Sequence, residues 1–287
     1  MVLLNHEKMA RQPAIKYPKI SKEQMKLFYR HYGEGPPLVI LHGIFGLSDN
    51  WVSIGKKLAE KFSVYIPDQR NHGQSPHSDA FDYDVLSGDL EEFIRTHELE
   101  NPVLIGHSMG GKVVMKYALE NPEPINRLVV VDMSPRKYSP RLFHQKMIAA
   151  MLSVDFAATD SRTEIEEQLA LSIPQPSIRQ FMLKNLYRPE RSTLAWRPNL
   201  EAISNNLAEV FEAIVSSNPY LGPSLFVRGG ESDYITDSDR PAIKLLFPNS
   251  SIETIAGASH WVHSDKPDEL CALFSWFLGK DCEFRTT

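Results

Sequence analysis

The sequence predicts an α/β fold in which a mostly parallel β-sheet is flanked by helices on both faces. From about residue 25 onward, short apolar segments alternate with amphipathic ones, which is the pattern of a parallel sheet with crossover helices. The segment Arg127–Val131 is apolar after its first residue, as expected for a central strand that is buried on both faces. With 42% hydrophobic residues in 287, the chain can bury a large core as a single α/β domain.

Seven segments are predicted to form the strands: Met25–Tyr32, Pro37–Leu41, Ser63–Pro67, Val103–Ile105, Arg127–Val131, Ser224–Arg228 and Ser251–Ile255. Helices are predicted at Val52–Lys61 and Lys112–Leu119. A further helix is indicated by residues at helical spacing that form one buried stripe: Leu86, Leu90, Phe93, Ile94 and His97. The C-terminal helix is predicted to bury Leu270, Leu273, Phe274 and Phe277.

The alternation of strands and helices stops between Ser134 and about Ser217. This stretch is helical in character, holds no convincing strand, and is divided into short pieces by prolines at 174, 176, 189 and 198. We therefore predict a core formed by residues 25–134 and 218–287, with a helical cap of residues 135–217 inserted into it. A separate small domain is the alternative, but no linker flanks the segment.

The composition limits the partners and the cellular compartment that we expect for this chain. A net charge of −5 gives no reason to expect a nucleic-acid partner, and apolar runs of only a few residues exclude a membrane span. Two cysteines, Cys271 and Cys282, are poor material for a disulfide framework, which favours a reducing, cytoplasmic compartment. The first thirty residues are rich in lysine and contain two acids, so we predict a flexible arm at residues 1–24. A mitochondrial targeting signal there is the alternative. The oligomeric state stays open.

The motif Gly106–Gly110 is the most informative part of the chain. It follows the apolar run Val103–Ile105 and precedes a predicted helix, which places Ser108 on a sharp turn between strand and helix. Glycines two residues before and after a serine fit such a turn, because larger side chains would collide with the strand or the helix. The turn exposes the hydroxyl at the edge of the sheet, next to a helix N-terminus. Ser108 is thus predicted to be a nucleophile.

A serine nucleophile needs a base and an acid that orients the base. In this architecture the acid and the histidine follow the serine in the chain. His260 is the predicted base because its loop follows the last strand, and His263 is its rival. The acid is either Asp132, at the end of the strand after the predicted helix, or Asp233, after the strand that begins at Ser224. Both would lie at the carboxyl edge of the sheet.

The negative charge that develops on a substrate oxygen needs preorganised donors. The backbone N–H of Met109 is one candidate because it follows the nucleophile. The second is expected from the loop His42–Gly46, where Gly43 allows the backbone to turn inward. Ile44 N–H is the first choice there and Phe45 N–H the second.

Six motifs occur in a characteristic order: His42–Gly46, Asp49–Trp51, Asp68–Ser75, Gly106–Lys112, Val131–Pro135 and Gly257–His263. On these motifs the chain, from residue 25 to its end, resembles the α/β-hydrolase superfamily. More narrowly, it is similar to a group that holds small bacterial acyl esterases, mitochondrial abhydrolases and yeast ethanol acetyltransferases. That group places its acid 24 residues after the nucleophile, as Asp132 follows Ser108. The resemblance therefore implies Asp132 as the acid and an assisting role for Ser232, while most other α/β-hydrolases place the acid where Asp233 stands.

Together these observations predict a serine carboxylic-ester hydrolase that acts on small-molecule esters of short- to medium-chain acids through an acyl-enzyme. Its predicted triad is Ser108, Asp132 and His260, and we expect no cofactor and no metal because no cluster with zinc-ligand spacing occurs. Phe45 and Trp261 are predicted to line an apolar acyl pocket, unless they belong to the core. The alternatives are an alcohol acyltransferase that uses the same triad and a non-catalytic ligand receptor.

Overall fold

The computed structural model describes residues 25–121, 124–139, 142–189 and 193–279. Its main sheet has seven strands in the order β1-β3-β2-β4-β5-β8-β9, and only β1 is antiparallel to its neighbour. The strands are β1 (Tyr29–Tyr32), β2 (Pro37–Leu41), β3 (Ser63–Pro67), β4 (Val103–His107), β5 (Arg127–Val131), β8 (Ser224–Gly229) and β9 (Ser250–Ile255). The predicted α/β fold is confirmed.

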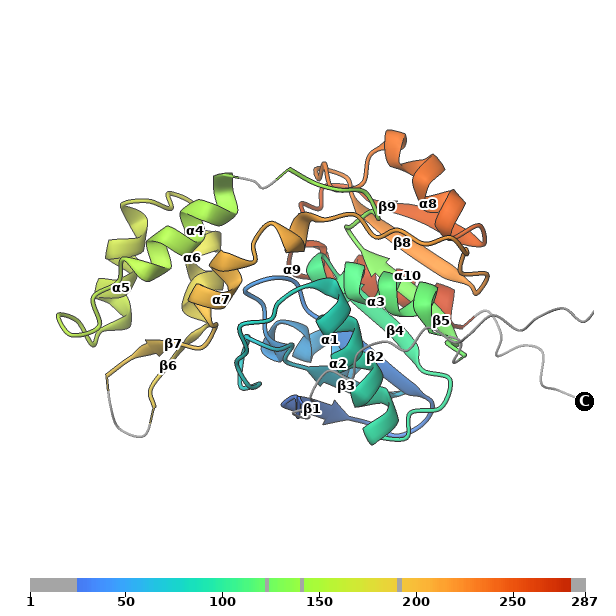
Figure 1. The fold of residues 1–287 in the computed structure, drawn as a ribbon, viewed down its shortest axis with the longest axis horizontal. Helices are drawn as coiled ribbons and strands as arrows, with labels where there is room; N and C mark the ends of the chain where they lie inside the picture. The colour runs from blue at the N-terminus through green and yellow to red at the C-terminus, as the bar shows by residue number, and fades with distance from the viewer. Residues whose placement is uncertain (1–24, 122–123, 140–141, 190–192, 280–287) are drawn as a thin grey trace, which may run out of the picture.

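Helices cover both faces of this sheet (Figure 1). A cluster of buried side chains lies on each face. On one face, α1 (Val52–Leu58) and α10 (Pro267–Leu278) pack on alternate residues of the strands, among them Leu38 and Ile40. On the other face, α2 (Tyr83–Thr96), α3 (Met109–Glu120) and α8 (Arg240–Leu246) pack on the residues between, such as Val39 and Leu41. Because successive strand residues point to opposite faces, a continuously apolar strand supplies both clusters.

The segment between β5 and β8 forms a group of helices beside the core, drawn in green and yellow in Figure 1. Its elements, which we call the insertion, are α4 (Leu142–Leu152), α5 (Arg162–Ala170), α6 (Pro176–Leu183), β6 (Leu186–Tyr187), β7 (Ala195–Trp196) and α7 (Leu200–Asn205). The expectation of no strand here was wrong, because β6 and β7 pair as a small antiparallel sheet. Two residues per strand are too few to show a periodicity of two in the sequence.

The two chain segments that join the insertion to the core run alongside each other. Ile214 N–H donates to the carbonyl of Pro135 at 2.8 Å, and Tyr138 N–H donates to the carbonyl of Phe211 at 2.8 Å. Lys112 of α3 contacts both segments, because its ammonium group donates to the carbonyls of Arg136 and Glu212. The insertion is therefore tied at its base to the helix that begins after Ser108.

A few sequence-based limits differ from the structure. The first strand begins at Tyr29 rather than Met25, since it pairs with β3 only from that residue onward. The C-terminal helix buries Leu270, Phe274 and Phe277 as predicted, while Leu273 is only half-buried. The predicted arm at residues 1–24 and Cys282 lie outside the described residues.

Among the described helices, none combines the length and the apolar character needed to cross a bilayer. Short elements complete the fold: η1 (Ser48–Trp51), η2 (Glu209–Phe211), η3 (Asp237–Asp239) and α9 (Val262–Asp265).

Candidate active site

Ser108 lies between β4 and α3 in a strained backbone conformation, with φ 53° and ψ −119°. Its N–H donates to the carbonyl of Val131 on the next strand at 3.1 Å, which holds the turn against the sheet. The flanking glycines are required sterically. A Cβ at Gly106 would lie 2.2 Å from the carbonyl oxygen of Gly110, and one at Gly110 would lie 2.6 Å from that of His42. Only glycine fits two residues before and two residues after the serine, and the sequence can form this sharp turn because it has glycine at both positions.

His260 links Ser108 to a carboxylate. Its Nε2 lies 2.9 Å from the Ser108 hydroxyl oxygen, and its Nδ1 lies 2.8 Å from Asp132 Oδ2. Because a carboxylate can only accept, Nδ1 carries the proton that is donated to Asp132, and Nε2 is free to accept from the serine hydroxyl. The backbone also contributes, since His107 Nε2 lies 2.8 Å from the carbonyl of His260. The structure brings these residues together from the ends of β4, β5 and the loop after β9.

Asp132 is fully buried and follows β5 directly, with φ 49°. Its N–H donates to the carbonyl of Val227 at 2.7 Å, and its Oδ1 accepts from the N–H of Gly229 at 2.9 Å. The hydroxyl of Ser232 donates to the same Oδ2 that faces His260. Asp233, the other candidate acid, is exposed, and its carbonyl accepts from the Arg136 guanidinium at 3.1 Å. His260 thus contacts Asp132, and Ser232 lies where the resemblance implied an assisting group.

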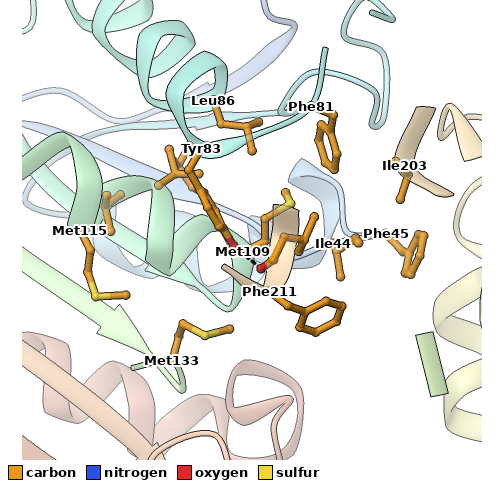
Figure 2. Close-up of a cluster of buried hydrophobic side chains, with 14 of the residues drawn as sticks. Ile44, Phe45, Phe81, Tyr83, Leu86, Met109, Met115, Met133, Ile203 and Phe211 are labelled. Atoms are coloured by element: carbon orange, nitrogen blue, oxygen red, sulfur yellow. Dashed lines mark hydrogen bonds between the residues drawn. The ribbon is translucent and has the colours of Figure 1, made fainter. Parts of the chain in front are cut away.

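The loop His42–Gly46 lies opposite Ser108 and presents backbone donors. Among the described residues, the N–H groups of Ile44 and Met109 have no hydrogen-bond acceptor. Phe45 N–H, the second choice, donates instead to Nε2 of His72 at 3.0 Å. Figure 2 shows the side chains of Ile44 and Met109 in one apolar cluster, with Phe211 from the segment that leaves the insertion.

Two buried histidines hold this loop in place, and both imidazole rings are neutral. Burial lowers the pKa of His42 from 6.5 to about 4. Burial, and next the neighbouring His42, lowers the pKa of His72 to about 3. Nε2 of each ring accepts a backbone N–H, from Gln69 at 3.0 Å for His42 and from Phe45 for His72. A protonated ring would present a donor at these positions, so both bonds require the neutral imidazole.

A small cavity of about 30 Å³ lies at Ser108. The core contributes His107, His260, Trp261 and the loop His42–Gly46, and the insertion contributes Phe143, His144, Met147 and Phe181. Phe45 and Trp261, the predicted pocket residues, both line it. Side chains of the insertion therefore form part of the wall of this cavity.

Sequence reasoning missed two residues that shape the site, Tyr234 and Asn185. The ring of Tyr234 stacks on His260, with centroids 3.7 Å apart and planes 16° apart. Asn185, between α6 and β6, donates from Nδ2 to the carbonyl of Phe45 at 2.8 Å. His263, the rival base, stacks instead on Trp51 at 4.6 Å. Neither Tyr234 nor Asn185 carried a signal in the sequence, because each contact joins segments far apart in the chain.

An acid, a histidine and a serine joined in this order, next to two unpaired N–H groups, form an arrangement that can deprotonate a hydroxyl and bind an oxyanion. On this fold, such a site defines the class of α/β-hydrolases. The chain belongs to this family, since the sequence model of the α/β-hydrolase fold family matches residues 36–267. The suspected membership is therefore confirmed.

Individual relatives indicate to which members of the family the chain is similar. The chain is 42% identical over 256 residues to the sn-1-specific diacylglycerol lipase ABHD11 of Xenopus laevis, covering 87% of this chain and 80% of the relative. It is 36% identical to a probable alcohol acetyltransferase of Saccharomyces cerevisiae, covering 83% and 75%. The solved structure of a marine microorganism esterase has a TM-score of 0.86 and 42% identity, covering 88% of this chain and 99% of that one. These relatives place the chain among the esterases and lipases of the family.

Proposed function

We propose that this protein is a serine carboxylic-ester hydrolase with the triad Ser108, His260 and Asp132. The single observation that carries the proposal is the hydrogen-bonded chain from Asp132 Oδ2 through both nitrogens of His260 to the Ser108 hydroxyl, with distances of 2.8 and 2.9 Å. A serine hydroxyl is a weak nucleophile until a neighbouring base accepts its proton. Here the base is already in contact with the hydroxyl.

In the proposed reaction, Ser108 attacks the ester carbonyl while His260 Nε2 accepts its proton. The N–H groups of Ile44 and Met109 stabilise the negative charge on the carbonyl oxygen. Asp132 keeps the proton on Nδ1 and stabilises the imidazolium that forms. His260 then protonates the leaving alcohol, and it later activates the water that releases the acid from Ser108.

We further propose that the insertion acts as a cap over the acyl group, and that the acyl group is of short to medium length. This proposal is supported by the small volume of the cavity at Ser108, about 30 Å³, and by the apolar side chains of Phe143, Met147 and Phe181 around it. Binding sites for larger ligands typically enclose about 300 Å³ or more. A longer acyl chain would therefore need a movement of α4 or α6.

Transfer of the acyl group to an alcohol is the second candidate function. It is favoured by one specific observation, the similarity to a probable alcohol acetyltransferase of Saccharomyces cerevisiae. The first half-reaction is the same in both cases. The two functions differ only in whether water or an alcohol reaches the acyl-enzyme.

Hydrolysis of p-nitrophenyl esters of increasing acyl length tests the proposal. We expect turnover to be highest for short acyl chains and to fall by more than about 1000-fold in Ser108→Ala and in His260→Ala. Circular dichroism of both variants provides the control that the fold is retained. Turnover that survives in Ser108→Ala would contradict the serine mechanism, and acceleration by added short alcohols with ester formation would favour acyl transfer.

A further inference from the structure

The ring of Tyr234 lies face to face with the imidazole of His260. The two ring planes are 16° apart, and their centroids are 3.7 Å apart. The other rings near His260 are more distant and less parallel, with His107 at 4.9 Å and 39° and Trp261 at 5.9 Å and 70°. Tyr234 therefore covers one face of the base at van der Waals distance, whereas the two hydrogen bonds to its nitrogens lie at the edge of the ring.

The loop that carries Tyr234 is bound to the loop that carries His260. Tyr234 is buried and follows β8, and in the same loop the N–H of Glu231 donates to the carbonyl of Ala258 at 2.9 Å. Ala258 lies two residues before His260. Because this bond joins backbone to backbone, the position of one ring against the other is set by the two loops as well as by the contact between the side chains.

Two hydroxyl groups hold the backbone of Tyr234. The hydroxyl oxygen of Ser232 accepts the N–H of Tyr234 at 3.2 Å, and the same hydroxyl donates to Asp132 Oδ2. The hydroxyl of Tyr138 donates to the carbonyl of Tyr234 at 2.6 Å. Tyr138 belongs to the segment that leads from β5 into the insertion. The backbone of Tyr234 is therefore tied both to the acid of the proposed triad and to the base of the insertion.

The stacking contact matters most once Ser108 carries the acyl group. Before the reaction, the imidazole of His260 has one hydrogen bond at each nitrogen, to Ser108 and to Asp132. In the proposed reaction, Ser108 Oγ forms its bond to the acyl carbon and its proton passes through His260 Nε2 to the leaving alcohol, so this oxygen no longer has a proton to donate. Of the two bonds, the one from Nδ1 to Asp132 remains, and a ring held at one edge can tilt about it. The face of Tyr234 opposes that tilt.

We propose that Tyr234 is a positioning residue of this reaction, whose ring keeps the imidazole of His260 oriented toward the attacking water while Ser108 carries the acyl group. Through its hydrogen bond to the Tyr234 carbonyl, Tyr138 extends this role to the base of the insertion. The inference rests on the proposed function and assigns both tyrosines to the second half-reaction, the release of the acid. Loss of the stacking contact then slows deacylation more than acylation.

Separate measurement of the two half-reactions with p-nitrophenyl acetate tests the proposal. The rate of acylation is the rate of p-nitrophenol release with enzyme in excess. The ratio of acetylated to free enzyme at saturating ester, measured by rapid quench and intact-protein mass spectrometry, gives the rate constant of acylation divided by that of deacylation. In Tyr234→Met, which removes the aromatic face but fills the space, we expect this ratio to rise by at least about threefold, the size of one lost aromatic contact, while acylation falls by less than about twofold. Tyr234→Phe keeps the aromatic face and should keep the wild-type ratio.

A second pair of variants leaves Tyr234 in place. Tyr138→Phe removes the hydroxyl that donates to the Tyr234 carbonyl. Tyr83→Phe is the matched control, because the hydroxyl of Tyr83 donates to a carbonyl in the segment that leaves the insertion, that of Val210, at 2.7 Å. We expect the ratio of acetylated to free enzyme to rise by about twofold in Tyr138→Phe and to stay unchanged in Tyr83→Phe. This pair carries the test if Tyr234→Met does not fold, which circular dichroism checks.

The outcomes separate the two proposals. An unchanged ratio in Tyr234→Met, or an equal rise in Tyr234→Phe, would overturn the inference while p-nitrophenyl acetate is still hydrolysed through Ser108. Equal ratios in Tyr138→Phe and Tyr83→Phe would overturn the part assigned to Tyr138, and the whole inference where Tyr234→Met does not fold. If the wild type fails to hydrolyse p-nitrophenyl acetate, or if Ser108→Ala still does so, the proposed function itself fails, and the inference with it.

Discussion

The core and the insertion hold the same loop, His42–Gly46, by different means. From the core, His72 accepts the N–H of Phe45 at 3.0 Å, and His42 is itself fixed by the N–H of Gln69. From the insertion, a single amide group, that of Asn185, donates to the carbonyl of Phe45 at 2.8 Å. The core thus fixes the loop by a network of buried rings and backbone groups, whereas among the described residues of the insertion the hydrogen bond to the loop comes from the side chain of Asn185.

The same difference extends to the rest of the site. Ser108 and Asp132 each follow one of two neighbouring parallel strands, whose register pairs His107 with Val131. Their positions are therefore set by the hydrogen-bond ladder of the sheet. Phe143, Met147 and Phe181 reach the cavity from α4 and α6, outside that ladder. We therefore expect the proposed chemistry to depend mainly on the core and the space for substrate mainly on the insertion, so that most substitutions in the two regions have separable effects.

The largest expected effect concerns the two carboxylates of the core. Asp132→Asn should lower kcat by about 10⁴-fold, because an amide cannot hold the His260 proton on Nδ1 in the orientation that serves Ser108. Asp233→Asn, at an exposed position, should change kcat by less than about twofold. Steady-state kinetics on one p-nitrophenyl ester measure both. Equal losses, or the reverse order, would remove Asp132 from the proposed triad.

Most strands of the core and the position of Ser108 were predictable from the sequence. Pro37–Leu41, Ser63–Pro67 and Arg127–Val131 occur with the predicted bounds, because strands buried on both faces are continuously apolar. The position of Ser108 was also predictable, since the glycines around it have a steric reason that is local in the chain. The strand pattern alone did not decide between Asp132 and Asp233, because both follow strands that end at the same edge of the sheet, and the prediction of Asp132 depended on the family resemblance.

The insertion could be predicted only as helical. Its strands β6 and β7 are too short for a pattern, and the contact between Asn185 and Phe45 joins residues 140 positions apart. The stacking of Tyr234 on His260 was not predictable for the same reason. Such contacts depend on the packing of whole elements against each other, which no local spacing encodes.

The second prediction concerns the stability of the core in acid. His72 has a pKa of about 3 in the fold and 6.5 as the ordinary value, so the unfolded chain binds more protons between these values. The free energy of unfolding should therefore fall as the pH decreases below 6.5. In His72→Gln the fall between pH 7.5 and 5 should be smaller by about 2 kcal/mol, measured by urea denaturation. An equally steep fall in the variant would contradict the neutral, buried state of His72.

The third prediction tests the amide of Asn185, by which the insertion contacts the loop. Asn185→Ala leaves the carbonyl of Phe45 without its donor, and we expect kcat to fall by about tenfold because the N–H of Ile44 is then less well positioned. Asn206→Ala is the matched control, since Asn206 also joins the insertion to the core, through the carbonyl of Asp79 at 2.9 Å. If both variants lose stability but neither loses kcat, the insertion acts on substrate space alone.

The smallest expected effect lies where core and insertion are joined. Burial lowers the pKa of Lys112 from 10.5 to about 7, so the unfolded chain binds more protons than the folded one between these values. The free energy of unfolding should therefore rise with pH in this window, by about 1 kcal/mol between pH 7 and 8. Lys112→Met should abolish this rise. Lys116→Met should keep it, because Lys116 lies on the same helix but pairs with Asp84 and Glu120 instead of the two connecting segments. A rise that persists in Lys112→Met would show that the base of the insertion is not held by a lysine that loses its proton.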